Sequence, residues 1–512
     1  MKQSKTFKEP RRRFATYVLV LLMLSAIVIA AFSCGPAEET PGTAERVTSP
    51  PATNQNGGTG AGNENGNGEN GVRTFQFPSG ADFEGQPIRI ITHDNSAWAW
   101  SEITTEELTG EPINDAIYHR NARVEAGLNV EIVEFHGGDA AGRARRAIQA
   151  GSDEFDVVFT NSADAGPLAV QGMYLDLNDI LELELDAPWW NQNAHESAEL
   201  LGRLFFTTSD GNLVTNDAIW VLYFNTQILQ DLQLDCPYTM VREGRWTMEN
   251  YYAMLRASAI DRTGSGIWTV EDQWGISTHH IAFMAFFIGQ GQMLTGLDNH
   301  GEPYLIVPDD RFVSAFYNAH RVMDQASGLF LNAQGGYPGR TEALGHATRT
   351  FMANMSLFAG ETLSHARVFR EMTADFGLLP HPKYDEHQEN HYTFMIDTVP
   401  AFGIPVTVRE PYRIGLFMNA FTAISAEILM PAYYEASLHG RFTRDEDSIE
   451  MLDIIRERRV FDRSVIYNWA NYYVNFFTHG VTNPNPVTLH ERFERMMENQ
   501  IQRTLDQFLM LD

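Results

Sequence analysis

Several of the nine tryptophans in this chain stand close to amide and carboxylate side chains. Two such segments, "HDNSAWAW" and "TNSAD", carry Asp94, Asn95, Trp98, Trp100, Asn161 and Asp164. A flat aromatic face can stack on the C–H side of a sugar ring, while amides and carboxylates bond its hydroxyl groups. These residues are therefore candidates for binding a polar, ring-shaped solute.

Motifs for catalysis and nucleotide binding are missing from the sequence. It contains no H-E-x-x-H, no G-x-S-x-G, no P-loop and no G-x-G-x-x-G after a strand. His381, His387 and His391 could gather a metal ion, but "HPKYDEHQENH" favours a solvated loop. The segment 297–303, "LDNHGEP", lacks the later ligands of a calcium loop and predicts a hairpin turn. We predict no catalytic residue, no metal site and no cofactor.

Alternating strand and helix patterns position the first candidates. The stretches 87–93, 129–135 and 155–159 are rich in β-branched and apolar residues and predict strands. Helices are predicted between them, one with apolar residues at helical spacing and a stop at Gly127, and one over 141–151. This alternation predicts an α/β lobe with parallel strands, and ligands bind at the carboxyl ends of such strands.

Farther along, the pattern becomes more helical. Residues 218–229 predict a strand that leads into a helix, and 243–255 predict a helix with Thr247 as N-cap. The apolar stretch 279–291 predicts a buried helix, because it is too short to span a membrane. A terminal helix is predicted with one apolar face, formed by Leu489, Phe493, Met496, Met497, Ile501, Leu505, Phe508 and Leu509.

The N-terminus has the layout of a secretory signal. Basic Arg11–Arg13 precede an uncharged apolar run over 14–32, and Cys34 follows a small residue. "AFSC" resembles a lipobox, in which the cysteine thiol receives a diacylglyceryl group, although Ala31 and Phe32 depart from the usual pattern. We predict a signal peptide over 1–33 and a lipid on Cys34. A retained membrane helix is the alternative, because the run approaches the ~20 residues that span a bilayer.

The composition after Cys34 predicts a tether. Residues 34–74 are rich in Gly and Asn and poor in large apolar residues, so they are expected to stay unfolded. With Cys34 lipidated, Cys236 has no partner, and we expect no disulfide and a packed Cys236. The net charge of −29 repels phosphate backbones, so nucleic acid is excluded as a partner.

Five segments in a fixed order carry a family resemblance. They are "GEPINDAIYHRNARVEAGLNVEI", "FDVVFTNSADAGPLAVQGMYLDLNDI", "APWWNQN", "NDAIWVLYFNTQILQDLQLDCPYTMVREGRWTMENY" and "DFGLLPHPKYDEHQENHYT". Together they resemble the extracellular solute-binding lipoproteins of ABC importers, of the large kind related to the maltose-binding class. The resemblance runs from about residue 86 to near the C-terminus.

The resemblance implies an α/β, two-lobed, type II periplasmic-binding-protein fold with a hinge, an interlobe cleft and a helix-rich C-terminal part. The implied boundaries are 75–216 for lobe 1, 217–350 for lobe 2, 351–400 for a return to lobe 1, and 401–512 for lobe 2 and the C-terminal helices. It implies a membrane-anchored monomer that delivers a carbohydrate, in particular an oligosaccharide, to ABC permease subunits and performs no chemistry. The alternatives are a surface polysaccharide-active hydrolase and a receptor for a peptide or another solute.

Matching segments to the family adds further candidate cleft residues. They are Trp190, Trp220 at the implied hinge, Trp268 and Trp274 in lobe 2, Glu361 and Asp397. Trp189 and Trp190 are adjacent and cannot share one face, so at most one of them reaches the cleft. For each candidate, the alternative is packing within its own lobe.

Overall fold

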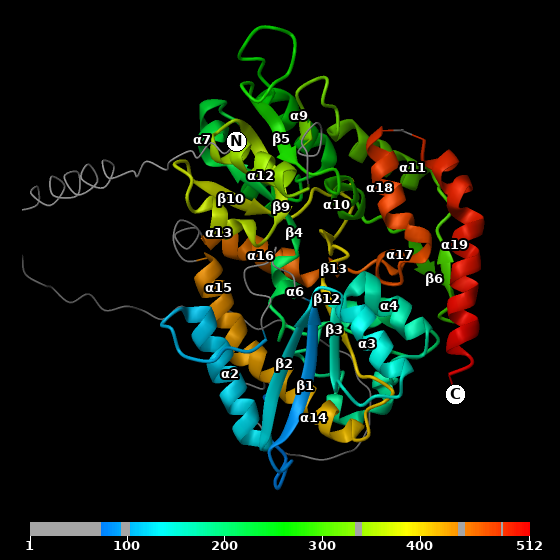
Figure 1. The fold of residues 1–512 in the computed structure, drawn as a ribbon. Helices are drawn as coiled ribbons and strands as arrows, with labels where there is room; N and C mark the ends of the chain where they lie inside the picture. The colour runs from blue at the N-terminus through cyan, green and yellow to red at the C-terminus, as the bar shows by residue number, and fades with distance from the viewer. Residues whose placement is uncertain (1–72, 94–102, 333–339, 439–445, 483–484, 512) are drawn as a thin grey trace, which may run out of the picture. The chain divides into compact units, whose positions relative to one another are not determined.

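The computed structural model describes residues 73–93, 103–332, 340–438, 446–482 and 485–511 (Figure 1). All of them belong to one compact unit, Gly66–Asp512. The predicted signal peptide, Cys34 and nearly all of the predicted tether lie outside the described residues, as do Asp94, Asn95, Trp98 and Trp100.

The first sheet has the predicted parallel core. Its strands are β1 (Gln86–His93), β2 (Val130–Gly137), β3 (Val157–Asn161) and β12 (Pro400–Gly403), in the order β12-β3-β1-β2. β1 pairs in parallel with β2 and β3, and β12 is antiparallel to β3. Ile88, Ile90 and Ile91 of β1 are fully buried, because helices pack on this sheet and bury the central strand.

Three helices connect and cover these strands: α2 (Pro112–Leu128), α3 (Ala140–Gln149) and α4 (Ser162–Val170). The predicted apolar face of α2 is buried. Gly127, however, does not end this helix, which continues to Leu128 and is capped by Asn129 in the left-handed conformation. Gly127 instead allows a close approach, because a Cβ there would lie 2.3 Å from the ring of Phe77.

The second sheet is mixed. Its strands are β4 (Trp220–Asn225), β5 (Trp274–Thr278), β8 (Phe330–Asn332), β9 (Ser356–Thr362) and β10 (Phe376–Leu379), in the order β10-β4-β9-β5-β8. β9 is parallel to β5 and antiparallel to β4. The helices in this part of the chain are α7 (Thr226–Asp231), α8 (Pro237–Arg242), α9 (Met248–Ser258), α10 (Ala282–Gly289), α11 (Asp310–Val322), α12 (Arg340–Met352) and α13 (His365–Phe369).

The predicted return to the first lobe at 351–400 is wrong for most of its length. β9 lies inside the second sheet, between β4 and β5, and β10 also joins that sheet. The chain returns only through β11 (Thr393–Phe394), where Met395 bridges to Ile219, and then β12. Every residue of β9 is buried, and a fully buried strand carries no alternation that would assign it to one sheet.

The predicted assignment of 401–512 to the second lobe also needs correction. α14 (Pro411–Ile424) packs against α2, and α15 (Met430–Leu438) packs against both α2 and α13. A π-helical turn, η3 (Ser425–Leu429), joins α14 to α15. Among the described residues, the stretch Pro411–Ala436 is long and apolar enough to cross a membrane, but 78% of its apolar window is buried inside the protein.

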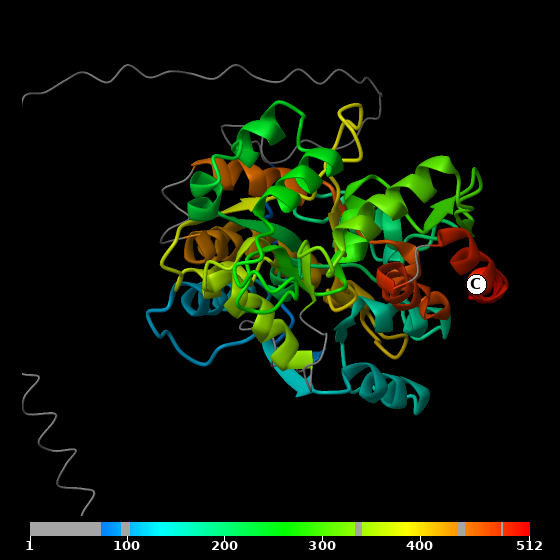
Figure 2. The ribbon, with the colours of Figure 1, turned by 90° about the horizontal axis from the view of Figure 1, so that it is seen from above.

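The remaining elements connect and flank the two sheets. They are η1 (Leu177–Asp179), η2 (Leu181–Leu183), α5 (Gln192–Ala198), α6 (Val214–Asp217), β6 (Thr295–Leu297), β7 (Pro303–Leu305), α16 (Glu446–Glu457), β13 (Arg459–Val460), α17 (Arg463–Ile466), η4 (Trp469–Asn471), α18 (Tyr472–Thr482) and α19 (Pro486–Phe508). Figures 1 and 2 show α18 and α19 beside α11.

Several local predictions are confirmed. The Thr247 side chain caps α9, α10 is buried throughout, and β6 and β7 form the predicted hairpin. The apolar face of α19 is also confirmed, except that Met496 and Leu509 are exposed.

Two predictions about single residues are wrong. Cys236 is exposed, because it precedes Pro237 at the N-cap position of α8. His381 and His391 are buried rather than solvated, since the His381 ring packs 5.4 Å from that of Phe286. Burial lowers the pKa of His381 to about 3 and that of His391 to about 4.

Candidate functional site

The carboxyl ends of the first sheet gather polar residues around a small cavity. β1 ends at His93 and β3 ends at Asn161, which lies opposite Pro400 at the start of β12. The cavity is lined by His93, Phe159, Thr160, Asn161, Asn212, Val214, Thr398 and Pro400. The structure thus places Asn161 where the strand pattern predicts a ligand-facing position.

One hydroxyl group in this cavity has unused hydrogen-bonding capacity. Thr398 Oγ1 is buried and has no hydrogen-bond partner among the described residues. Leaving a buried hydroxyl unpaired costs about 1–3 kcal/mol. The cavity has a volume of about 10 Å³, which is the space of about one water molecule.

The start of α4 brings two further predicted residues to this edge. The backbone carbonyl of Asp397 accepts hydrogen bonds from Ser162 Oγ (3.1 Å) and Ala163 N (3.3 Å). Asp164 lies in the first turn of α4, where partial burial raises the pKa of its carboxyl and the nearby His93 opposes that shift. Asn161, Asp164 and Asp397 are therefore close together, around one helix start.

β1 ends at His93, and the next residues, 94–102, lie outside the described part of the chain. The candidate roles of Asp94, Asn95, Trp98 and Trp100 therefore stay predictions.

Trp220 begins β4, directly after α6 carries the chain away from this cavity. Its partner across the sheet is Thr362, the last residue of β9. The side chain is only 4% exposed, and its indole Nε1 has no hydrogen-bond partner in the part of the chain that the structure describes. Because indole N–H groups usually find an acceptor when buried, this donor is available to a bound molecule or an ordered water.

Glu361 is next to Thr362 on β9 but points to the opposite face of the sheet. It is 1% exposed, and its Oε1 has no hydrogen-bond partner. His365 Nε2 of α13 lies 3.7 Å from its other oxygen. Burial raises the pKa of Glu361 to about 8. The structure therefore does not bring Glu361 and Trp220 together on one face.

Three predicted tryptophans lie away from the site. Trp190 belongs to the core of the first half, since its Nε1 donates to the Leu183 carbonyl (2.9 Å) and its ring lies 5.9 Å from that of Phe402. Trp274 begins β5, whereas the edge near Trp220 is formed by the other end of that strand, Thr278. The two ends are about 13 Å apart at ~3.3 Å per residue. The Trp268 ring is tilted by 52° against that of Trp274, with ring centroids 5.4 Å apart, and lies over Gly328.

The sequence analysis missed His93, Asn212 and Thr398. His93 is the last residue of a predicted strand, so its position could have identified it by the argument that identified Asn161. Asn212 and Thr398 come from segments far away in the sequence, and no local pattern marks them.

The connection between the two halves contains a buried ion pair. Arg367 of α13 donates from Nη1 and Nη2 to the two carboxylate oxygens of Asp217 in α6, at 2.9 and 2.7 Å. The Tyr433 hydroxyl of α15 donates to the same carboxylate at 2.6 Å. Since α15 also packs on α2, this cluster links helices that cover both sheets.

Comparison with known proteins identifies the class of this fold. Residues 111–299 match the family described as bacterial extracellular solute-binding protein. The structure resembles the maltose/maltodextrin-binding domain from Bdellovibrio bacteriovorus bound to maltotriose, with a TM-score of 0.50 and 11% identity over 81% of this chain and 100% of that one. A cyclo/maltodextrin-binding protein complexed with maltotetraose gives a TM-score of 0.52 and 11% identity, with coverages of 82% and 97%.

A third similar structure extends the comparison. An ABC substrate-binding protein from Listeria monocytogenes in complex with cycloalternan gives a TM-score of 0.50 and 13% identity, over 83% of this chain and 99% of that one. No curated protein matches this sequence significantly.

The predicted resemblance and the predicted fold class are confirmed. The fold is that of the type II periplasmic binding proteins, and residues 111–299 carry the pattern of a solute-binding family. That family is extracellular, which implies an exported protein. The family and the similar structures are binding proteins rather than enzymes.

Proposed function

We propose that this protein captures a carbohydrate, in particular an oligosaccharide, outside the cell and delivers it to the permease subunits of an ABC importer. The match of residues 111–299 to the solute-binding family is the observation that carries this proposal. The carbohydrate class is supported by the similar structures, whose ligands are maltotriose, maltotetraose and cycloalternan.

The side chains at the first-sheet edge carry the polar groups that such a solute needs. The hydroxyl of Thr398 and the amide of Asn161 can exchange hydrogen bonds with sugar hydroxyl groups. Aromatic faces would come from Trp98 or Trp100, as the sequence predicts, with Trp220 at the connection between the halves. Capture by a two-lobed binding protein proceeds through hinge closure, and the permease would recognise the closed form.

We further propose that a lipid on Cys34 anchors a monomer to the outer face of the membrane. A coil of about 40 residues has a root-mean-square span of roughly 35 Å, which would hold the folded part away from the bilayer. Mass spectrometry of the membrane fraction tests this directly. A diacylglyceryl mass on Cys34 as the new N-terminus is expected, and an intact leader with an unmodified Cys34 would contradict the anchor.

The ligand proposal is tested by thermal unfolding with maltotriose, maltotetraose, a cyclic maltodextrin and a tripeptide of similar size. A ligand at 100 times its Kd should stabilise the fold by about 2.7 kcal/mol. Solution scattering of the same samples should show a smaller radius of gyration with the bound sugar. If only the tripeptide stabilises the protein against thermal unfolding, the solute is a peptide rather than a carbohydrate. Release of shorter sugars during incubation would favour the alternative of a polysaccharide-active hydrolase.

A further inference from the structure

Arg120, in the middle of α2, is completely buried and bonds to three distant parts of the chain. Its Nη2 donates to the carbonyl of Ile103 at 2.7 Å. Its Nη1 donates to the carbonyl of Gly211 at 3.2 Å and to Ser425 Oγ of the π-helical turn η3 at 2.9 Å. Its Nε donates to Asn121 Oδ1 at 2.6 Å. One side chain thus joins the backbone at 103, the segment before α6 and the connection between α14 and α15.

The charge of Arg120 is compensated through a peptide group. All of its hydrogen-bond acceptors in the described part of the chain are neutral. The peptide that joins Ile103 to Thr104 accepts from Arg120 with its carbonyl and donates through Thr104 N to Glu134 Oε2 at 2.8 Å. Burial lowers the pKa of Arg120 to about 9, and the Glu134 carboxylate opposes that shift. The dipole of this peptide therefore lies between two buried groups of opposite charge.

Glu134 of β2 holds the backbone on the other side of that peptide. Its side chain is 2% exposed, and its carboxylate accepts hydrogen bonds from Ile103 N at 3.0 Å and from the Thr104 hydroxyl at 2.8 Å. It also accepts from Thr92 Oγ1 of β1 at 3.0 Å. Thr92 directly precedes His93, which lines the cavity at the first-sheet edge.

The segment before α6 is held in a similar way. Arg120 bonds the Gly211 carbonyl, and the next residue, Asn212, lines the same cavity. The ring of Phe421 packs on Gly211, where a Cβ would lie 2.0 Å from it, and the Arg120 guanidinium lies 4.0 Å from the centre of that ring. Asn212 and His93, which are far apart in sequence, are thus both adjacent to backbone that the two buried charges hold.

Stability alone does not explain this arrangement. Taking a guanidinium out of water costs several kcal/mol, and replacing buried ionic groups by apolar side chains of similar volume is often neutral or stabilising. The planar guanidinium fork, however, holds several acceptors at fixed angles, which an apolar side chain cannot do. Fixed backbone geometry beside a cavity is what a binding site requires of the residues that support it.

We infer that Arg120, together with Glu134, is a positioning residue for solute binding. The two side chains hold the backbone beside Asn212 and His93, so that these residues meet the bound sugar in one geometry. Neither Arg120 nor Glu134 lines the cavity itself, so each acts through its neighbours. The inference rests on the proposed function and adds two residues to it.

The test compares Arg120→Met with Arg413→Met. Arg413 is also a buried arginine on the first sheet, but it donates to the carbonyl of Pro87 at the start of β1 and lies 3.7 Å from Asp156, at the end of the sheet opposite the cavity. Both variants should lower the urea midpoint. Only Arg120→Met should raise the Kd for the best-bound maltodextrin, by about tenfold or more in calorimetric titration. An unchanged Kd, or an equal rise in both variants, would overturn the inference.

Arg120→Lys provides a second variant, which also serves if Arg120→Met does not fold. It keeps the charge but loses the fork, so its Kd should lie between those of the wild type and Arg120→Met. Hydrogen exchange adds a measurement that needs no ligand. Peptides that contain Thr104 and Asn212 should exchange faster in Arg120→Lys than in the wild type, whereas those of α19 should not change. Acceleration over the whole chain would indicate a general loss of stability and would contradict positioning.

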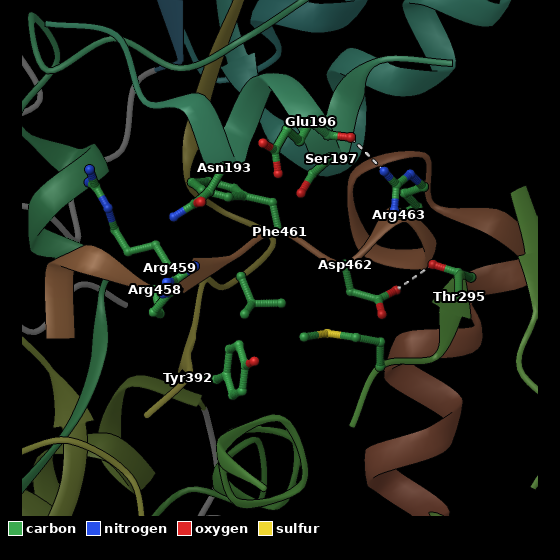
Figure 3. A pocket seen from close by; sticks show the side chains of 12 residues that line it. Asn193, Glu196, Ser197, Thr295, Tyr392, Arg458, Arg459, Phe461, Asp462 and Arg463 are labelled. Carbon is green, nitrogen blue, oxygen red and sulfur yellow. Dashed lines mark hydrogen bonds between the residues drawn. The ribbon is translucent and has the colours of Figure 1, made fainter. Parts of the chain in front are cut away.

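Another cavity distinguishes a failure of this inference from binding elsewhere. It has a volume of about 240 Å³, and its walls include Ser197 of α5, Tyr392 and Asp462 (Figure 3). Ser197→Phe would fill this cavity. A Kd that Ser197→Phe raises and Arg120→Met leaves unchanged would overturn the inference. If no sugar binds the wild-type protein, the proposed function fails, and hydrogen exchange alone then decides whether Arg120 positions Asn212.

Discussion

Polar side chains lie in different surroundings at two sheet edges. One is the edge of the first sheet at His93, and the other is the edge of the second sheet at Trp220. At the first edge, Asn161 and Thr398 line a cavity, and the Thr398 hydroxyl has no partner among the described residues. At the second edge, Thr278 is fully buried and its hydroxyl donates to the carbonyl of Gly360, and Glu361 is enclosed under α13. The first edge presents polar side chains to a cavity, whereas the second buries its polar groups, including the unpartnered Nε1 of Trp220 and Oε1 of Glu361, away from that cavity.

The difference follows from what each edge connects. The second edge receives the chain as it crosses from α6 into β4, and the buried pair of Asp217 and Arg367 lies beside that crossing. A crossing must hold its geometry, and Asp217, Arg367 and Tyr433 pair with one another there. Variants at the second edge should therefore change stability, and variants at the first edge should change binding.

The largest effect is expected for Arg367→Met. It leaves the fully buried Asp217 carboxylate with only the Tyr433 hydroxyl as a side-chain partner, and breaking a buried pair in this way costs about 3–5 kcal/mol. Urea unfolding measures the loss. The double variant Asp217→Asn/Arg367→Met should recover part of it, because no uncompensated charge remains. A loss below about 1 kcal/mol in the single variant would show that the pair is not needed.

The next effect is a gain in stability for Glu361→Gln that depends on pH. The pKa of Glu361 is about 8 in the folded protein, against an ordinary value of 4.5, so the folded state keeps a proton that the unfolded state releases. Wild-type stability must therefore fall as pH rises from 4.5 to 8, and glutamine removes this loss. We expect the variant to be more stable at pH 8 by about 2–4 kcal/mol and equally stable near pH 4.

Urea titrations at several pH values measure this difference. The neighbouring His365, whose pKa burial lowers to about 4, titrates in the opposite sense, but it is present in both proteins and cancels in the comparison. A difference that does not change with pH would mean that Glu361 is ionised in the folded state.

These contrasts also separate what the sequence could predict from what it could not. The strands and helices of the first lobe were predictable because β-branched runs and helical spacing are local, as the buried face of α2 shows. The position of β9 was not, because a strand buried on both faces fits the centre of either sheet. Because β9 was assigned to the wrong sheet, the predicted boundaries of the second lobe were wrong as well.

The residues of the candidate site also divide into those that the sequence could predict and those that it could not. Asn161 was predictable because it ends a recognisable strand, but Asn212 joins it only through folding. Trp274 was attractive as an aromatic residue, yet its residue type does not say which end of β5 it occupies.

A smaller effect should distinguish two buried tryptophans of the second half. Trp246 Nε1 donates to the Pro380 carbonyl at 2.8 Å, whereas Trp220 Nε1 has no partner among the described residues. Replacement by phenylalanine costs packing in both, but only Trp246→Phe leaves a buried carbonyl unpaired. We expect Trp246→Phe to lose about 1–3 kcal/mol more than Trp220→Phe in urea unfolding. Equal losses would mean that the Trp220 N–H is satisfied, for example by an ordered water.

The smallest expected effect tests the first edge. Asn161→Ala removes an amide that lines the cavity but makes no side-chain cap to α4, so stability should change by less than about 0.5 kcal/mol. Its loss should raise the Kd for the best-bound maltodextrin about three- to tenfold, the worth of one hydrogen bond. Asn475→Ala, which removes an exposed amide on α18 that donates to the Asn471 carbonyl, is the control and should leave the Kd unchanged. If the two variants bind alike, the ligand does not contact Asn161, and the polar groups of the first edge would then be internal, as those of the second edge are.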